Sequence, residues 1–130
     1  MEMKLDKVND FVQLTETGEI DLERSKQIIR EIAAAALSYL GHNIIVDFRE
    51  TTLAGTWGMS NILELAMEFA PYRAFFRGKL ANLVPDDERW LTAARQFEVS
   101  LEIQGFVFSV FTSLEDAIKW FSETGDLRQR

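Results

Sequence analysis

Two short stretches near the start of the chain alternate apolar with polar residues, at positions 4–8 and 11–15. This alternation predicts two strands that each turn one face to the core and the other face to water. Asn9 and Asp10 lie between the stretches and are typical of a two-residue hairpin turn. Thr17 and Gly18 are expected to end the second strand.

The rest of the chain alternates between helical spacing and short, continuous apolar runs. Helical spacing predicts helices at positions 22–40, 59–70 and 114–123, and a further helix that starts within positions 85–88 and is broken by Gly105. The continuous runs predict strands at positions 44–49, 79–84 and 106–111, covered on both faces as in a parallel sheet. Positions 50–58, which contain glycine and threonine, are expected to form a loop.

The same spacing predicts which helix residues face the core. In the first helix these include Ile28, Ile29, Ile32, Leu37 and Leu40. In the second they are Met59, Ile62, Leu63, Ala66, Met67 and Ala70, and in the last they are Leu114, Ala117, Ile118 and Phe121.

The resulting order of elements is ββαβαβαβα, which defines an α/β fold. Strands and helices that alternate with short connections require right-handed crossovers onto a largely parallel sheet. We therefore expect a mixed, mostly parallel five-stranded sheet with four helices. No repeat or long linker divides the chain, so positions 1–130 are expected to form a single domain with a frayed tail at about 126–130.

The composition of the chain limits which kinds of molecule it is expected to bind. The chain has 130 residues, 47% of them apolar, and it contains no cysteine, which excludes disulfides and thiolate metal sites and favours a cytoplasmic location. The net charge of −7 disfavours nucleic acids and anionic lipid surfaces. Neither a signal peptide nor an apolar run of membrane-spanning length is present, so we expect no membrane span.

Catalytic and metal-binding patterns are weak. His42 is the only histidine, so neither a zinc site nor a His-based triad is expected. The acidic run at positions 86–88 is explained by the favourable interaction of acidic residues with a helix start. No nucleotide-binding glycine motif occurs, and we expect no cofactor and no enzymatic activity. Asp47 and Arg49 at the end of a strand could bind a small polar molecule, or they could pair with each other.

Three segments resemble the STAS domain family. The sequence GEID at positions 18–21 is similar to the family's pattern of glycine, any residue, an apolar residue and Asp before the first helix. The sequence IVDFR at 45–49 resembles the family's central strand, which ends in Asp. The sequence VFTSLEDAIKWF at 110–121 resembles the closing strand and helix of a divergent branch of small standalone bacterial proteins. The resemblance covers nearly the whole chain and implies a STAS-like fold.

The loop after Asp47 is where this chain departs from the family. Anti-sigma-factor antagonists carry Asp-Ser-Ser/Thr-Gly there, and the first Ser receives a phosphate from a partner kinase. Counted from Asp47, this chain has Gly55, Thr56, Trp57 and Gly58 at those positions. The resemblance implies that Thr56 is a phosphoacceptor at a helix start, where a phosphate meets free N–H groups. A plain capping or loop threonine is the alternative.

Two surfaces are candidates for a protein partner. The resemblance implies an interaction loop that includes Asp47, Arg49, Trp57, Gly58 and Met59. An aromatic–basic cluster follows the second helix and consists of Tyr72, Arg73, Phe75, Phe76 and Arg77. Exposed aromatic and arginine side chains often mark interfaces, but these rings could equally belong to the core.

The resemblance implies a non-catalytic regulatory or protein-interaction module, a degenerate relative of the anti-sigma-factor antagonists. The divergent branch is also similar in topology to CRAL-TRIO lipid-transfer domains, which implies the alternative of a carrier for a small apolar ligand. A homodimer is permitted by the apolar helix faces.

Overall fold

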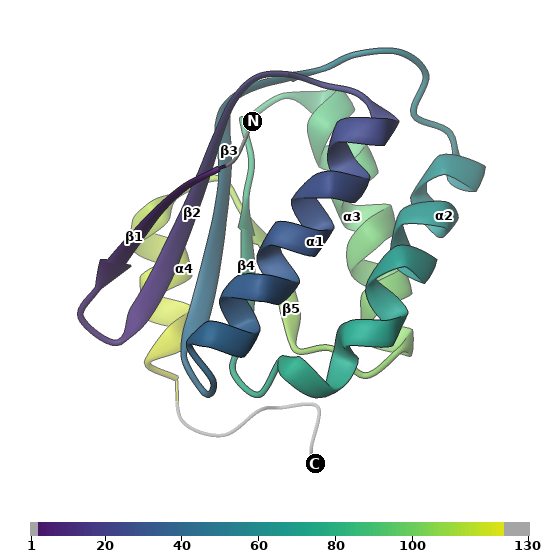
Figure 1. Ribbon diagram of the computed structural model, residues 1–130. Coiled ribbons are helices and arrows are strands. Elements are labelled where there is room, and N and C mark those ends of the chain that lie inside the picture. The colour runs from purple at the N-terminus through teal and green to yellow at the C-terminus, as the bar shows by residue number, and fades with distance from the viewer. Residues whose placement is uncertain (1–2, 124–130) are drawn as a thin grey trace.

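The computed structural model describes residues 3–123, which form a sheet with helices on both faces (Figure 1). The strands are β1 (Lys4–Val8), β2 (Phe11–Ile20), β3 (Asn43–Leu53), β4 (Leu80–Leu83) and β5 (Phe108–Phe111). The helices are α1 (Leu22–Ser38), α2 (Met59–Phe69), α3 (Glu88–Ile103) and α4 (Leu114–Phe121), with a 3₁₀ segment, η1 (Ala70–Phe75), after α2. The predicted order and type of these elements are confirmed. The tail predicted at 126–130 lies outside the described residues.

The strands lie in the sheet in the order of the chain, β1-β2-β3-β4-β5. β1 pairs antiparallel with β2, and each of the remaining pairs is parallel. Asn9 in the hairpin turn has a φ of 54°, in the left-handed region that Asn tolerates better than most residues. The sheet is therefore the mixed, mostly parallel one that the sequence predicted.

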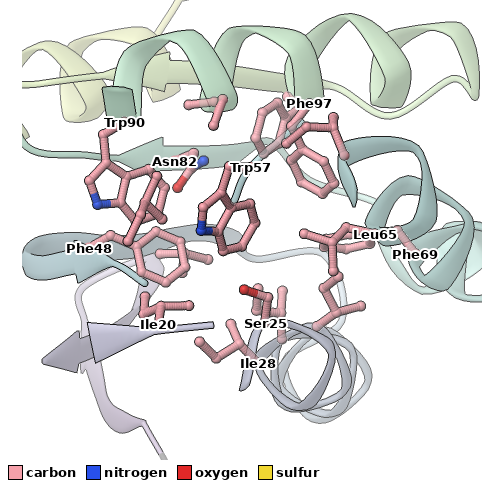
Figure 2. Close-up of a pocket in the computed structure, with 18 of the residues that line it drawn as sticks. Ile20, Ser25, Ile28, Phe48, Trp57, Leu65, Phe69, Asn82, Trp90 and Phe97 are labelled. Carbon is pink, nitrogen blue, oxygen red and sulfur yellow. The ribbon is translucent and has the colours of Figure 1, made fainter. Parts of the chain in front are cut away.

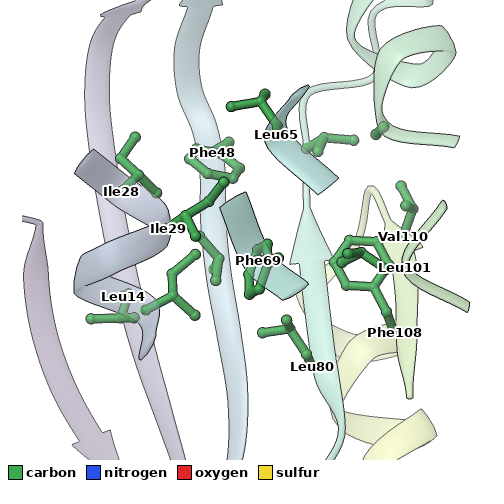
Figure 3. Packing of buried hydrophobic residues seen from close by; sticks show 14 of the residues in the cluster. Leu14, Ile28, Ile29, Phe48, Leu65, Phe69, Leu80, Leu101, Phe108 and Val110 are labelled. Carbon is green, nitrogen blue, oxygen red and sulfur yellow. The ribbon is translucent and has the colours of Figure 1, made fainter. Parts of the chain in front are cut away.

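The helices divide unevenly between the two faces of the sheet. Successive right-handed crossovers in one direction place α1, α2 and α3 together on one face, and α4 covers part of the other (Figure 1). The larger core lies between the sheet and α1–α3. Figure 3 shows part of its packing, with Leu14, Ile28, Ile29, Phe48, Leu65, Phe69, Leu80, Leu101, Phe108 and Val110 labelled. A smaller core surrounds Ala117 of α4.

β2 and β3 both continue past their predicted ends. Gly18 pairs with Thr51, and Ile20 pairs with Leu53, in parallel register. The prediction that Thr17 and Gly18 end β2 is therefore wrong, and so is the assignment of positions 50–53 to a loop. The extension depends on pairing between segments that are far apart in the chain, and local turn preference does not reveal such pairing.

The spacing also misplaced part of the buried surface of α2. Its buried residues are Ile62, Leu65, Ala66 and Phe69. Met59, Leu63 and Met67, which were predicted to face the core, are 51%, 49% and 73% exposed. Apolar residues occupy two sides of this helix, and only packing against the sheet decides which side is buried.

Smaller corrections apply to α1 and α4. Leu37 and Leu40, at the end of α1 and just beyond it, are 53% and 48% exposed. Ile118 of α4 is 40% exposed, whereas Ala117 is fully buried as predicted.

A buried ion pair joins β2 to α1. Glu16 is 4% exposed and lies where the register between β2 and β3 shifts. Arg24 donates two hydrogen bonds to it, from Nε to Oε2 and from Nη2 to Oε1, both at 2.8 Å. Arg24 Nη1 also donates to Glu31 Oε2 at 2.8 Å. The hydrogen bonds with Glu16, and then with Glu31, raise the pKa of Arg24 above its ordinary value.

We expect Arg24→Met to lower the free energy of unfolding by about 3 kcal/mol, because it leaves the buried Glu16 carboxylate without its partner. A urea titration followed by tryptophan fluorescence measures this value. Arg95→Met is the matched control, since Arg95 is 62% exposed and lies 3.7 Å from Glu98 in a surface pair. The control should change stability by less than about 0.5 kcal/mol. Equal losses in the two variants would contradict a stabilising role for the buried pair.

Candidate functional site

The candidate site is the loop at positions 54–58, which joins β3 to α2. It begins beside the end of β2, where the Ala54 N–H donates to Ile20 O at 2.9 Å. Gly55 has a φ of 82°, which favours glycine and turns the chain toward α2. At the other end, Asn61 Oδ1 accepts a hydrogen bond from the Gly58 N–H at 3.0 Å and caps the helix start. The loop is therefore fixed at both ends.

Arg89, near the start of α3, holds the first part of this loop. Its Nη1 donates to Leu53 O at 2.8 Å, and its Nη2 donates to Gly55 O. One planar guanidinium thus binds two backbone carbonyls and fixes their relative position. Sequence reasoning missed Arg89. The available signal was a cation in the first turn of a helix, where the dipole disfavours positive charge.

Trp57 connects the loop to the interior. Its indole Nε1 donates to Ala54 O at 3.0 Å, and its half-buried ring packs against the larger core. Its neighbours Thr56 and Met59 are exposed. The large residue that replaces a small one of the STAS pattern therefore fills the space between the loop and the core.

A cavity of about 70 Å³ lies between the sheet and α1–α3, with Trp57 in its wall (Figure 2). Most of the wall is apolar and includes Ile28, Phe48, Leu65 and Phe69. Pockets that enclose drug-sized ligands measure roughly 300–1,000 Å³. A cavity of this size gives no support to the predicted alternative of a lipid carrier.

Two residues that line this cavity each carry an unpaired polar atom. Asn82 of β4 is 6% exposed and Trp90 of α3 is 7% exposed. Within residues 3–123, neither Asn82 Oδ1 nor Trp90 Nε1 has a hydrogen-bond partner. Sequence reasoning did not single out Asn82. An asparagine inside the apolar run at positions 80–84 was the signal, because strands are depleted in Asn and buried amides are normally paired.

Asp47 and Arg49 lie away from this cavity. Phe48 packs in the core beneath α1–α3, and side chains alternate along a strand, so Asp47 points to the opposite face. Asp47 is 5% exposed and accepts hydrogen bonds from Gln13 Nε2 at 3.2 Å and from Arg49 Nε at 3.1 Å. The hydrogen bond with Asp47 raises the pKa of Arg49. Asp47 was expected at the end of its strand, but β3 continues to Leu53. The two residues pair with each other, which was the alternative to a ligand site.

The residues of the expected interaction loop are therefore divided between two faces of the sheet. Trp57, Gly58 and Met59 stay together at the loop and the start of α2, whereas Asp47 and Arg49 do not join them. Their role in binding a partner stays a prediction.

The aromatic–basic cluster lies in η1 and just after it. Tyr72, Phe75 and Phe76 are half-buried and pack against the larger core. Arg73 and Arg77 are exposed, and Arg73 Nε donates to the backbone O of Gln104 at 2.8 Å. The rings thus contribute to the core, as in the alternative interpretation, and a binding role for this cluster stays a prediction.

The remaining polar candidates have local explanations. The residues at 86–88 are exposed at the start of α3. The His42 ring lies edge-on to the Tyr39 ring, with 5.7 Å between the ring centroids. In the described part of the chain, no three carboxylate or imidazole side chains gather as a metal site would require. No helix between residues 3 and 123 has the length and apolar character needed to cross a membrane.

Comparisons with known proteins show a likeness of fold, although no protein-family model and no curated protein matches the chain. An uncharacterized protein of the DUF3478 family with a SpoIIAA-like fold, from Shewanella loihica, matches with a TM-score of 0.52 and 15% identity, over 92% of this chain and 91% of its own. The anti-sigma factor antagonist SpoIIAA in its unphosphorylated form matches with a TM-score of 0.49 and 20% identity, over 91% of this chain and 96% of its own. Bacillus SpoIIAA in its phosphorylated form, described as a cell fate determinant, matches with a TM-score of 0.47 and 18% identity, over 91% of this chain and 97% of its own.

The class of fold follows from these observations. The chain has a SpoIIAA-like fold, as the match to the Shewanella loihica protein shows. The STAS-like fold that the sequence resemblance implied is confirmed.

Arg89→Gln should loosen the loop at 54–58, because it removes hydrogen bonds that are worth roughly 0.5–1.5 kcal/mol each. We expect the amides of Ala54 and Gly58, which are hydrogen-bonded, to exchange with solvent about tenfold faster. Hydrogen exchange measured by NMR tests this expectation, and Arg95→Gln on the same helix is the control. Unchanged exchange at both amides would show that Arg89 does not hold the loop.

Proposed function

We propose that this chain is a non-catalytic regulatory module that acts by binding a protein partner. The contact surface consists of the loop at 54–58 and the outer side of α2. The observation that carries the proposal is a row of exposed apolar side chains on α2 that continues from this loop. The STAS-like fold supports the same function, because the resemblance in sequence is to regulators of that kind.

The row consists of Met59, Leu63 and Met67, which follow one another at intervals of four residues and therefore lie on one side of the helix. Their exposed fractions are 51%, 49% and 73%. Single exposed apolar residues are ordinary, but a contiguous apolar surface beside a polar rim is typical of an interface. Methionine is also well suited to binding surfaces, since its flexible side chain adapts to a partner.

Charged residues border this row on the side of α1. Glu64 pairs with Lys26, and Glu68 lies 3.6 Å from Arg30. These charges are compensated within the chain, so they form a polar rim that a partner can approach without leaving a buried charge unpaired.

Met67→Lys should weaken retention of the partner by about tenfold or more, because it places a charge in the apolar contact. The immobilised protein is exposed to an extract of the cells that carry it, and the retained proteins are quantified. Ile118→Lys is the matched control, since Ile118 is 40% exposed on α4, on the opposite face of the sheet. The proposal fails if no retained protein depends on Met67, or if both variants lose the same proteins.

Within this proposal, Thr56 is the phosphoacceptor. Thr56 is exposed and stands two residues before Gly58, the N-cap of α2, where a phosphate can meet backbone N–H groups and the positive end of the helix dipole. Phosphorylation would add a charge of about −1.5 to −2 beside the apolar row and so weaken a partner's binding.

Thr56→Glu should therefore reduce partner retention by about tenfold, whereas the neutral Thr56→Gln should leave it nearly unchanged. Phosphopeptide mass spectrometry of the protein from its own cells tests the modification itself. Equal retention by the two variants, together with an unmodified Thr56, would remove this residue from the proposed mechanism and leave the α2 surface standing.

A further inference from the structure

The cavity between the sheet and α1–α3 has a largely apolar wall, and two residues that line it, Asn82 and Trp90, each carry a buried polar atom that has no hydrogen-bond partner within residues 3–123. Asn82 lies in register between Val46 of β3 and Val110 of β5, so it is a polar residue in an otherwise apolar row across the sheet. Figure 2 shows its amide pointing into the space between Trp57 and Trp90. Asn82 Oδ1 can only accept a hydrogen bond, and Trp90 Nε1 can only donate one.

Both groups are held in place without a partner. The Trp90 ring stacks on Phe48 with 5.2 Å between centroids, which fixes the orientation of the indole. Asn82 belongs to a strand that pairs on both sides, which fixes its backbone. Buried polar groups are normally hydrogen-bonded, and two unpaired groups in one cavity call for a shared explanation.

The wall limits what a ligand can be. None of the residues that line the cavity is charged, so an ionised ligand would lose its hydration without compensation. Ser25 also lines the cavity, but its hydroxyl already donates to Asp21 O at 2.8 Å. The volume of about 70 Å³ is close to half of the roughly 150 Å³ of an apolar cavity that binds benzene. The ligand must therefore be small, uncharged and largely apolar.

We propose that this cavity binds a short-chain alcohol or a similar small molecule with one hydroxyl group. A hydroxyl donates to Asn82 Oδ1 and accepts from Trp90 Nε1. If the Asn82 amide is flipped so that its NH₂ group takes the place of Oδ1, the hydroxyl accepts a hydrogen bond from that group instead. The apolar part of the molecule contacts the surrounding aliphatic and aromatic side chains. This site lies apart from the exposed row on α2, and it shares only Trp57 with the proposed contact surface.

Access to the cavity is through Trp57. Of the residues that line the cavity, Trp57 and Phe97 are partly exposed and the others are buried. Phe97 lies within α3, whereas Trp57 lies on the loop that Arg89 holds. A rotation of the Trp57 ring opens the cavity without unfolding a helix.

The test is a titration of the ¹⁵N-labelled protein with ethanol and, separately, with chloroethane, followed by NMR of the tryptophan indole N–H signals. We expect a saturable shift of the Trp90 signal with ethanol, whereas the signal of Trp120, which lies in α4 on the other face of the sheet, should not shift. Binding of ethanol should be about tenfold tighter than binding of chloroethane, which cannot donate a hydrogen bond. An absent or non-saturable shift of Trp90, or equal affinities for the two probes, would overturn the proposal.

Asn82→Leu supplies a second test, because leucine has the same number of side-chain non-hydrogen atoms and the same branching. The variant should lose the preference for ethanol, and chloroethane should bind it at least as tightly, because the hydroxyl of ethanol is then buried without its acceptor. A preference that survives in the folded variant would overturn the role of Asn82. Should the variant not fold, the comparison of the two probes on the wild-type protein decides the proposal alone.

Discussion

The long parallel pairing of β2 with β3 determines where the loop and the cavity lie. Its register runs from Phe11 with Asn43 to Ile20 with Leu53, beyond the level at which β4 ends. Because β3 extends so far, the loop at 54–58 begins beside the end of β2 and can place an indole ring over the core before α2 starts. The buried ion pair between β2 and α1 secures the same end of the sheet.

α2 has two apolar sides with different uses. Ile62, Leu65 and Phe69 line the cavity, whereas Met59 and Met67 face solvent. One helix can therefore complete the core with one side and offer the other to a partner. Trp57, which precedes this helix, contacts the interior while its neighbours in the loop stay exposed, so the loop adjoins both surfaces.

The order and type of the elements follow from local patterns, and the sequence predicts them well. The lengths of β2 and β3 do not follow from local patterns, because residues such as Gly18 become part of a strand only through pairing with a distant segment. Thr56 and Trp57 could be found together because they are neighbours in the chain. Arg89 and Asn82 come from other elements, and the crossovers of the fold bring them to the loop and the cavity.

The strands occupy the sheet in the order in which they occur in the chain. Each new strand pairs with the strand made just before it, and no space must be kept open for a later segment. Such short separations between partners keep the entropy cost of closing each connection low. The sheet can thus grow outward from the β1–β2 hairpin as the chain leaves the ribosome, and α4 covers the second face last. The order of synthesis is also an order in which the fold can assemble.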